Sequence, residues 1–316
     1  MRTPFRSPLG PTKASAAIEK CIPVGSVVST YGFYSGEVEL YLSNRGRFIL
    51  SHTTKEAVFD IWQTLFDDPI SVSEIASRIL PFKGDKDFEI LQEQWYKYRN
   101  APARAALFFI LNNCSDSAYI SKGKLDLSNY NPVSLSRLKK FVKPENFHLQ
   151  LIESVKQNII EDNRSDVLFF HTERYQKDFL SEGFNRGVEE ESMGLREILT
   201  LIENRKYVIL TTPSPFLSEL DIQNMIFIDQ YGRETTEANA KEIILHNAAL
   251  CFIYGLKYAY SFFDSGWGPR FYIFSLSFVV MPVLFWYFMN ENFFTIKNMA
   301  SVFLATIILF IQMRFK

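Results

Sequence analysis

The densest set of side chains able to move protons follows a run of apolar residues at 167–170. The run VLFF is followed by His171, Thr172, Glu173, Arg174 and Tyr175. Neighbouring imidazole, carboxylate and guanidinium groups can serve as acid, base and electrostatic stabiliser, and a loop at a strand end of a parallel sheet is where ligands bind. The same residues also suit a solvated polar loop. We favour the solvated loop and expect no catalytic residue here.

A metal site would need more ligands than this region offers. His52 and His171 could meet at one edge of a sheet, but no third ligand stands at metal spacing from them. The three cysteines, Cys21, Cys114 and Cys251, are far apart and include no CxxC pair. We therefore expect no bound metal and no disulfide framework, only buried thiols in a reducing compartment.

Strand and helix patterns alternate along residues 1–247. Residues 26–42 begin as a β-branched strand, turn between Gly32 and Gly36 and continue as a helix, and residues 47–51 form the next strand. A strand, a glycine turn, a helix and a second strand in this order open a parallel α/β sheet. Further strands are expected at 167–170, 207–210, 225–228 and 242–245, and helices at 54–65, 72–80 and 101–112.

In this order the segments resemble the Dam-like family of DNA adenine-N6 methyltransferases, weakly but over nearly all of residues 1–247. The resemblance implies a Rossmann-like methyltransferase domain with a helical insertion at about 69–150. In the insertion, the family's Arg-Ala-Ala-x-Phe-x-x-Leu-Asn helix is closely matched by Arg104, Ala105, Ala106, Phe108, Leu111 and Asn112. This helix is expected to be mainly a packing element.

The positions that would bind S-adenosylmethionine in that family are altered here. Lys13, in SPLGPTK, stands for the lysine of a Pro-Gly-Gly-Lys segment. In TYGFYSGEVEL, Gly36 is retained, but Gly32 takes the position of an acid and Glu37 that of a glycine. His52 lies where the family has its ribose-binding Asn-Asp-x-Asn. The resemblance therefore implies remnant positions and no bound cofactor.

The catalytic loop of the family is altered as well. Its Asp-Pro-Pro-Tyr follows the fourth strand, accepts hydrogen bonds from the target amine and stacks on the flipped adenine. In this chain His171 replaces the acid, both prolines are absent, and Arg174 or Tyr175 takes the stacking position. We expect a pseudoenzyme.

The last quarter of the chain is predicted to be a membrane anchor. Residues 271–289 form a run of 19 uncharged residues. As a helix with a rise of about 1.5 Å per residue, this run is long enough to cross a bilayer core of about 30 Å. A second uncharged run at 299–313 is shorter, and together they predict a hairpin of two transmembrane helices over 271–313. Residues 248–270 are expected to form an interfacial or amphipathic segment. Flanking Lys and Arg residues place the soluble domain and the C-terminus on the cytoplasm-like side.

The expected partners follow from charge and anchoring. Residues 1–247 contain more acidic than basic side chains, whereas nucleic-acid binding draws its affinity from cations, so nucleic acid is disfavoured as a partner. The expected partners are a lipid bilayer and other protein subunits. The chain is then a structural or scaffolding subunit of a membrane-associated assembly, at an organellar inner membrane or in a virion with an internal membrane.

Two alternatives stay open. The chain could be an active, membrane-tethered DNA adenine-N6 methyltransferase that uses S-adenosylmethionine. It could instead be a tethered nucleic-acid binder without catalysis, which would need a basic face around Lys122, Lys124, Arg137, Lys139 and Lys140.

Overall fold

The computed structural model describes residues 3–172 except 81, 83, 121 and 122, and residues 193–247 except 221 and 223; at 218 and 219 it describes the backbone alone. The chain divides into two compact units, 1–254 and 255–316, and every described residue belongs to the first. The predicted interfacial segment and transmembrane hairpin lie outside the described residues. Within the described part, none of the helices has the length and apolarity to cross a bilayer.

Seven strands of the described chain form one sheet in the order β3-β2-β1-β4-β5-β7-β6. Strands β1 to β5 run parallel, while β7 pairs antiparallel with both β5 and β6. The described chain is therefore a mixed α/β fold with a mostly parallel sheet, which is compatible with the predicted Rossmann-like domain. The strands are β1 Val27–Tyr31, β2 Phe48–Thr53, β3 Phe147–Leu151, β4 Val167–His171, β5 Tyr207–Thr211, β6 Met225–Ile228 and β7 Glu242–His246.

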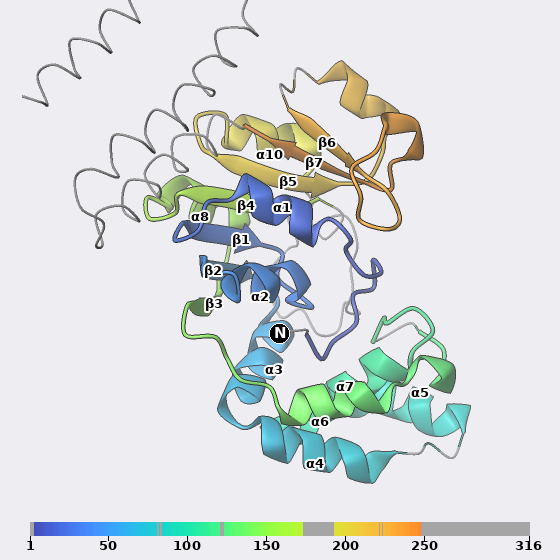
Figure 1. The fold of residues 1–316 in the computed structure, drawn as a ribbon. Helices are drawn as coiled ribbons and strands as arrows, with labels where there is room; N and C mark the ends of the chain where they lie inside the picture. Colours follow the sequence, from blue (N-terminus) through green and yellow to red (C-terminus); the bar gives the residue numbers. More distant parts are fainter. Residues whose placement is uncertain are drawn as a thin grey trace, which may run out of the picture. The chain divides into compact units, whose positions relative to one another are not determined.

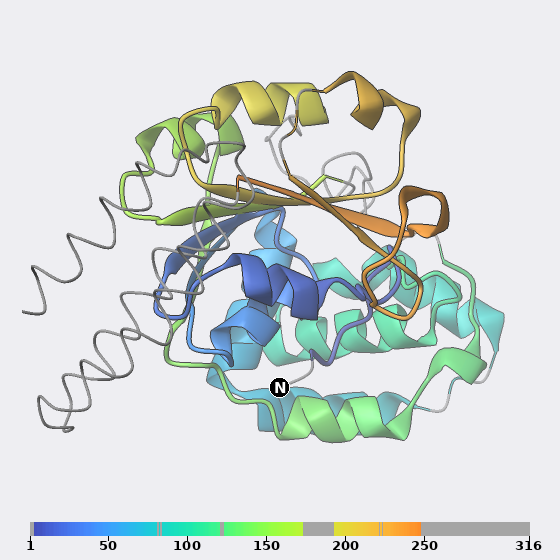
Figure 2. The ribbon, with the colours of Figure 1, turned by 45° about the horizontal axis from the view of Figure 1, so that its top comes forward.

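Helices cover both faces of the sheet (Figures 1 and 2). On one face lie α8 (Val155–Glu161) and α10 (Leu195–Leu201), which contact each other. On the other lie α1 (Ser15–Cys21), α2 (Glu37–Ser43) and α3 (Glu56–Asp67). Each face has its own apolar core, because successive residues of a buried strand point to opposite sides. Short 3-10 helices at Pro215–Glu219 and Glu237–Asn239 flank β6.

The insertion forms a helical layer beyond α3 (Figure 2). It contains α4 (Pro69–Ile79), α5 (Asp85–Gln94), α6 (Ala101–Cys114) and α7 (Pro132–Lys139), with 3-10 turns at Trp95–Lys97 and Leu127–Asn129. Local sequence sets where three of these helices begin: a proline lies in the first turn of α4, α6 and α7, and a capping side chain precedes it. The caps are Asp68, Asn100 and Asn131.

The predicted insertion extends too far at its C-terminal end. Residues 147–151, which the boundary at about 150 places inside it, form β3 and pair in parallel with β2 at the sheet edge. The strand is short, and His148, Gln150 and Leu151 are exposed, so it lacks the continuous apolar run that marks β4. The inserted helices therefore end before β3.

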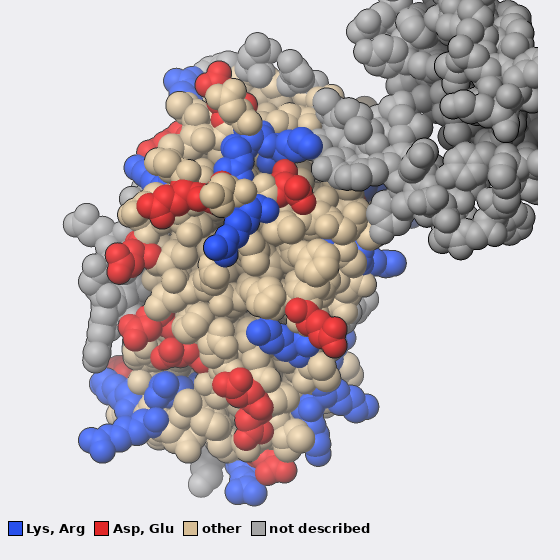
Figure 3. All heavy atoms as spheres, turned by 90° about the vertical axis from the view of Figure 1, so that its left-hand side faces the viewer, with Lys and Arg blue, Asp and Glu red and all other residues tan. Residues whose placement is uncertain are grey.

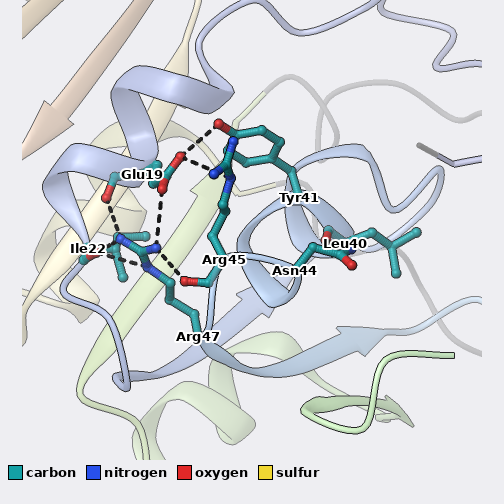
Figure 4. Close-up of polar contacts among 7 residues, drawn as sticks. All are labelled: Glu19, Ile22, Leu40, Tyr41, Asn44, Arg45 and Arg47. Carbon is teal, nitrogen blue, oxygen red and sulfur yellow. Dashed lines mark hydrogen bonds and ion pairs between the residues drawn. The ribbon is translucent and has the colours of Figure 1, made fainter. Parts of the chain in front are cut away.

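Arg47 joins α1 to the beginning of β2 (Figure 4). Its side chain is only 5% exposed. The guanidinium donates to the carbonyl oxygens of Ile22 (2.6 and 3.1 Å), Glu19 (2.9 Å) and Arg45 (2.7 Å). Two of these carbonyls, those of Glu19 and Ile22, lie at the C-terminal end of α1, where backbone donors run out; only the Glu19 carbonyl also accepts a hydrogen bond from the backbone there, from the Ile22 amide at 3.3 Å. Arg47 thus satisfies that helix end and holds it against the sheet.

Replacing Arg47 by methionine keeps much of its apolar stem but removes its hydrogen bonds to these carbonyls, including both bonds to the carbonyl of the buried Ile22. We expect Arg47→Met to lower the free energy of unfolding by about 2–4 kcal/mol. Arg45→Met is the matched control, because the Arg45 side chain is 58% exposed and forms an ion pair with Glu19, with Nε and Oε2 3.8 Å apart. Loss of this exposed ion pair should lower the free energy of unfolding by less than about 1 kcal/mol. Urea unfolding of the detergent-solubilised chain, followed by near-ultraviolet circular dichroism, measures both. Equal costs would contradict the assigned role.

Candidate functional site at the carboxyl edge of the sheet

The candidate site lies where the strand order reverses. Strand β1 is flanked by β2 and β4, and the chain leaves these two neighbours in opposite directions along the sheet. In open α/β folds the crevice at the carboxyl ends of such strands binds the ligand. Here that edge is formed by the turn from Gly32 to Gly36, by His52 and Thr53, and by His171 and Thr172.

The glycine turn leads directly from β1 into α2, as predicted. The Phe33 amide donates to the His52 carbonyl oxygen at 3.1 Å, which fixes the turn to β2. Gly36 has φ 68° and occupies the N-cap position of α2. A Cβ atom at Gly36 would lie 3.1 Å from the Trp62 ring and 3.2 Å from the Phe33 ring. This glycine is therefore required both by its backbone conformation and by the rings packed against it.

Aromatic rings fill the space beside this turn. The Phe33 ring is 1% exposed and packs edge to face against Trp62 with centroids 5.1 Å apart. The Trp62 Nε1–H donates to the Tyr34 carbonyl oxygen at 2.8 Å. Phe5, from the N-terminal segment, packs on Trp62 at 5.0 Å and on Phe108 of α6 at 5.2 Å. The turn, α3, the insertion and the N-terminal segment therefore meet in one close-packed aromatic cluster, which we define as Phe5, Phe33, Tyr34, Trp62 and Phe108.

The best-matched helix of the resemblance holds the N-terminal segment in place. Asn112, at 0% exposure in α6, accepts from the Arg6 amide at 2.7 Å and donates to the Arg6 carbonyl oxygen at 2.9 Å. The Arg6 guanidinium donates to the Ser115 carbonyl oxygen at 2.6 Å. Asn113 donates to the Pro4 carbonyl oxygen at 3.2 Å. The expectation that α6 is chiefly a packing element agrees with these contacts.

Two carboxylates accept hydrogen bonds from backbone amides of the N-terminal segment where it passes the sheet. Glu37, in the first turn of α2, accepts from the Thr12 amide at 3.1 Å. Glu242, at the start of β7, accepts from the amides of Lys13 at 2.8 Å and Ala14 at 2.9 Å. Burial raises the pKa of Glu242, and these amides oppose the rise. Lys13, a predicted remnant position, thus uses its backbone to bind a carboxylate of the chain itself.

The two predicted histidines do not converge. His52 and Phe170 both pair in register with Tyr31, so their side chains lie on one face of the sheet. The Tyr31 ring stacks between them, at 4.9 Å from His52 and 5.1 Å from Phe170. His171 is the next residue after Phe170, and its side chain points to the opposite face. Both imidazoles are buried, and a shared metal ion would need them on one side.

In the described part of the chain, no three side chains among His, Cys, Asp and Glu are grouped so that they could hold a metal ion.

Thr172 follows β4 and is the last described residue before the loop. Its amide donates a hydrogen bond to the Leu210 carbonyl oxygen at 3.0 Å, and its hydroxyl donates to the Thr211 hydroxyl at 3.0 Å. The predicted loop residues Glu173, Arg174 and Tyr175 lie outside the described residues.

Sequence reasoning did not identify the aromatic cluster or the Asn112 contacts. Trp62 belongs to the apolar stripe of α3, with Val58, Ile61 and Leu65, and nothing in that spacing distinguishes a residue beside a ligand crevice from any other core residue. The Asn112 contacts span 106 positions of the sequence. No short motif could have indicated them.

No protein-family model and no curated protein matches the chain. The resemblance to the Dam-like methyltransferases therefore stays a prediction.

Substituting Gly36 by alanine should separate backbone strain from crowding. Gly36 and Gly25 both have positive φ, but a Cβ atom at Gly25 would have no atom within 4 Å. Gly25→Ala is thus the control for the backbone cost alone, about 1–2 kcal/mol. Gly36→Ala should lose about 1–3 kcal/mol more, because the rings of Trp62 and Phe33 must move. Equal losses in urea unfolding would contradict the close packing.

Acid should destabilise the domain through His52. Burial lowers the pKa of His52, although its hydrogen bond to the Thr30 carbonyl oxygen at 3.1 Å opposes the shift. A group whose pKa is lower in the folded state binds more protons when unfolded, so stability falls as the pH drops below the unfolded pKa of about 6.5. His52→Phe, which keeps a ring on Tyr31, should have a smaller fall in unfolding midpoint between pH 7.5 and 5.5. An unchanged fall would assign the effect to other groups, such as the half-buried His246, whose pKa is also lowered by burial.

Proposed function

We propose that the chain is a catalytically inactive, methyltransferase-like protein anchored in a membrane by its C-terminal hairpin. It acts as a structural or scaffolding subunit of a membrane-associated assembly. The observation that carries the proposal is the aromatic cluster, because it packs large buried side chains of the chain itself against the glycine turn, where the resemblance places the cofactor.

The sheet topology supports a methyltransferase-like origin. The sheet, with the order β3-β2-β1-β4-β5-β7-β6 and β7 as its one antiparallel strand among the described residues, is compatible with the Rossmann-like domain that the resemblance implies. The positions at which the resemblance places cofactor binding, in the N-terminal segment and the glycine turn, lie close together in space because Thr12 contacts Glu37. Fold alone does not specify an activity, so the argument against catalysis must come from the site.

Packing at the glycine turn opposes cofactor binding. The family's glycines leave room for the cofactor to approach the backbone. Here Phe33, Tyr34 and Trp62 are each at most 3% exposed and are in contact with one another. Admitting a cofactor among them would require large apolar side chains to leave the core, at about 1.5–3 kcal/mol for each.

Glu37 opposes binding of an anionic group at the same place. In the resemblance it stands at a glycine position of the cofactor loop, and its carboxylate accepts from the Thr12 amide at 3.1 Å. An amide that already donates to a fixed carboxylate is not available to the carboxyl end of a ligand, and a second negative charge would be repelled. The chain thus supplies its own anion to the N-terminal segment.

The residues that would bind the rest of the substrate also serve packing. His52, at the expected ribose position, donates to Thr30 and stacks on Tyr31. Gly32, at the expected acid position, has no side chain, and His171 replaces the catalytic acid. Under this proposal the function of the domain depends on its membrane anchor, because the anchor fixes the domain at a surface where other subunits assemble.

Calorimetry with S-adenosylmethionine tests the loss of activity. We expect the folded, detergent-solubilised chain to show no binding tighter than a Kd of about 1 mM, with a cooperative thermal transition as the control for folding. A micromolar Kd would support the methyltransferase alternative and overturn the pseudoenzyme assignment. Co-purification from the native membrane tests the scaffolding role in the same preparation. A chain that emerges alone after mild solubilisation and cross-linking would contradict it.

A further inference from the structure

We propose that the amino edge of the sheet, the edge opposite the candidate site, lies against the lipid bilayer. The carboxyl edge then faces away from the membrane. This inference rests on the membrane anchor of the proposed function and adds the orientation of the domain to it.

The first observation is where the described chain ends. Because β7 is antiparallel to β5, it ends at the edge where β5 begins. Asn247, directly after β7, is bound there: it accepts from the Tyr207 amide at 2.9 Å and donates to the Arg205 carbonyl oxygen at 2.7 Å. The chain therefore leaves the sheet at its amino edge, on the way to the apolar runs at 271–289 and 299–313.

The connection to those runs favours a short separation from the membrane. Residues 248–263, AALCFIYGLKYAYSFF, carry a single charged side chain, Lys257. Exposure of a segment of this composition to water is unfavourable, whereas its burial at a lipid interface is favourable. Asn247 is thereby kept near the bilayer, and the edge that holds Asn247 is kept there with it.

The second observation is the set of apolar side chains exposed on this edge. Val24 lies in the turn before β1 and is 43% exposed, and Phe48 is the first residue of β2 and is 51% exposed. Val142 precedes β3 and is 66% exposed, and Ile160, in the last turn of α8 before β4, is 73% exposed. One such side chain thus stands at the approach to each of four neighbouring strands, and aliphatic or aromatic groups at loop tips insert into the interface of a bilayer.

Charges on this edge are mixed. Figure 3 views it directly and shows an uncharged band across the face with Lys, Arg, Asp and Glu side chains around it. Exposed cations such as Arg45, Arg164 and Lys206 alternate with the acids Glu161 and Glu203. Attraction to anionic headgroups is therefore not the main term. Contact should form on zwitterionic lipid and persist at high salt, unlike binding through a polybasic patch.

Site-directed fluorescence in vesicles of phosphatidylcholine tests the orientation on the full chain. A bimane label is attached at Val24→Cys and, separately, at Ile160→Cys. Each has a control of similar exposure at the carboxyl edge: Leu151→Cys for Val24 (44% and 43%) and Tyr231→Cys for Ile160 (71% and 73%). Native Cys21 and Cys114 are buried, and Cys251 is replaced by serine throughout.

Brominated phosphatidylcholine should quench emission at Val24 and Ile160 and leave Leu151 and Tyr231 unchanged, with 0.15 M and 1 M salt giving the same result. Equal quenching of both edges, or quenching of the carboxyl edge alone, overturns the proposed orientation. If neither aqueous iodide nor brominated lipid quenches the labels at Val24 and Ile160, these positions are covered by protein and not by lipid, which also overturns the proposed orientation. If the chain does not float with the vesicles, the membrane anchoring of the proposed function is overturned. Failure of the anchoring is thereby distinguished from failure of the orientation.

Discussion

The packing of Trp62 against its neighbours joins the N-terminal segment, the glycine turn and the connection before β3 in one of the two apolar cores of the described domain. This indole is fully buried and packs edge to face on Phe5, Phe33 and Phe141, which come from the N-terminal segment, the glycine turn and the connection before β3. Such pairs contribute about 0.5–1.5 kcal/mol each beyond the area they bury. Because Trp62 also donates to the Tyr34 carbonyl oxygen, the backbone of the turn is fixed by the same side chain. The sheet, the insertion and the N-terminal segment would each lose their common contact without it.

Periodicity in the sequence was sufficient to predict most of the fold. The strands at β1, β2, β4, β5, β6 and β7 all lie where β-branched or continuous apolar runs predict them, and the helices expected at 54–65, 72–80 and 101–112 are observed as α3, α4 and α6. Strand β3 was not predicted, because half-exposed residues such as His148 weaken its pattern. Its assignment depends on pairing with β2, a contact between residues about 100 positions apart that no local window contains.

At the candidate site, strand order could be predicted from the sequence, but side-chain contacts could not. The turn between Gly32 and Gly36 and the neighbouring ends of β2 and β4 form one edge, as strand order in a parallel sheet requires. Which side chains share a face could not be predicted from local sequence. His52 and His171 lie near the ends of β2 and β4, on either side of β1, but on opposite faces of the sheet, because Tyr31 pairs with His52 and with Phe170, the residue before His171. The contacts of Glu37 and Asn112 likewise join segments distant in sequence.

A filled crevice and a ligand-binding crevice make opposite demands on the same residues. Binding requires small side chains at the turn and polar groups left without internal partners, and both features cost folding stability. In this domain Phe33, Tyr34 and Trp62 are buried at the turn, and Glu37 and His52 form hydrogen bonds with the backbone of the chain. Each of these contacts stabilises the fold. The packing at the carboxyl edge and the apolar exposure at the amino edge are both consistent with the proposal that the domain is a folded block held at a membrane surface.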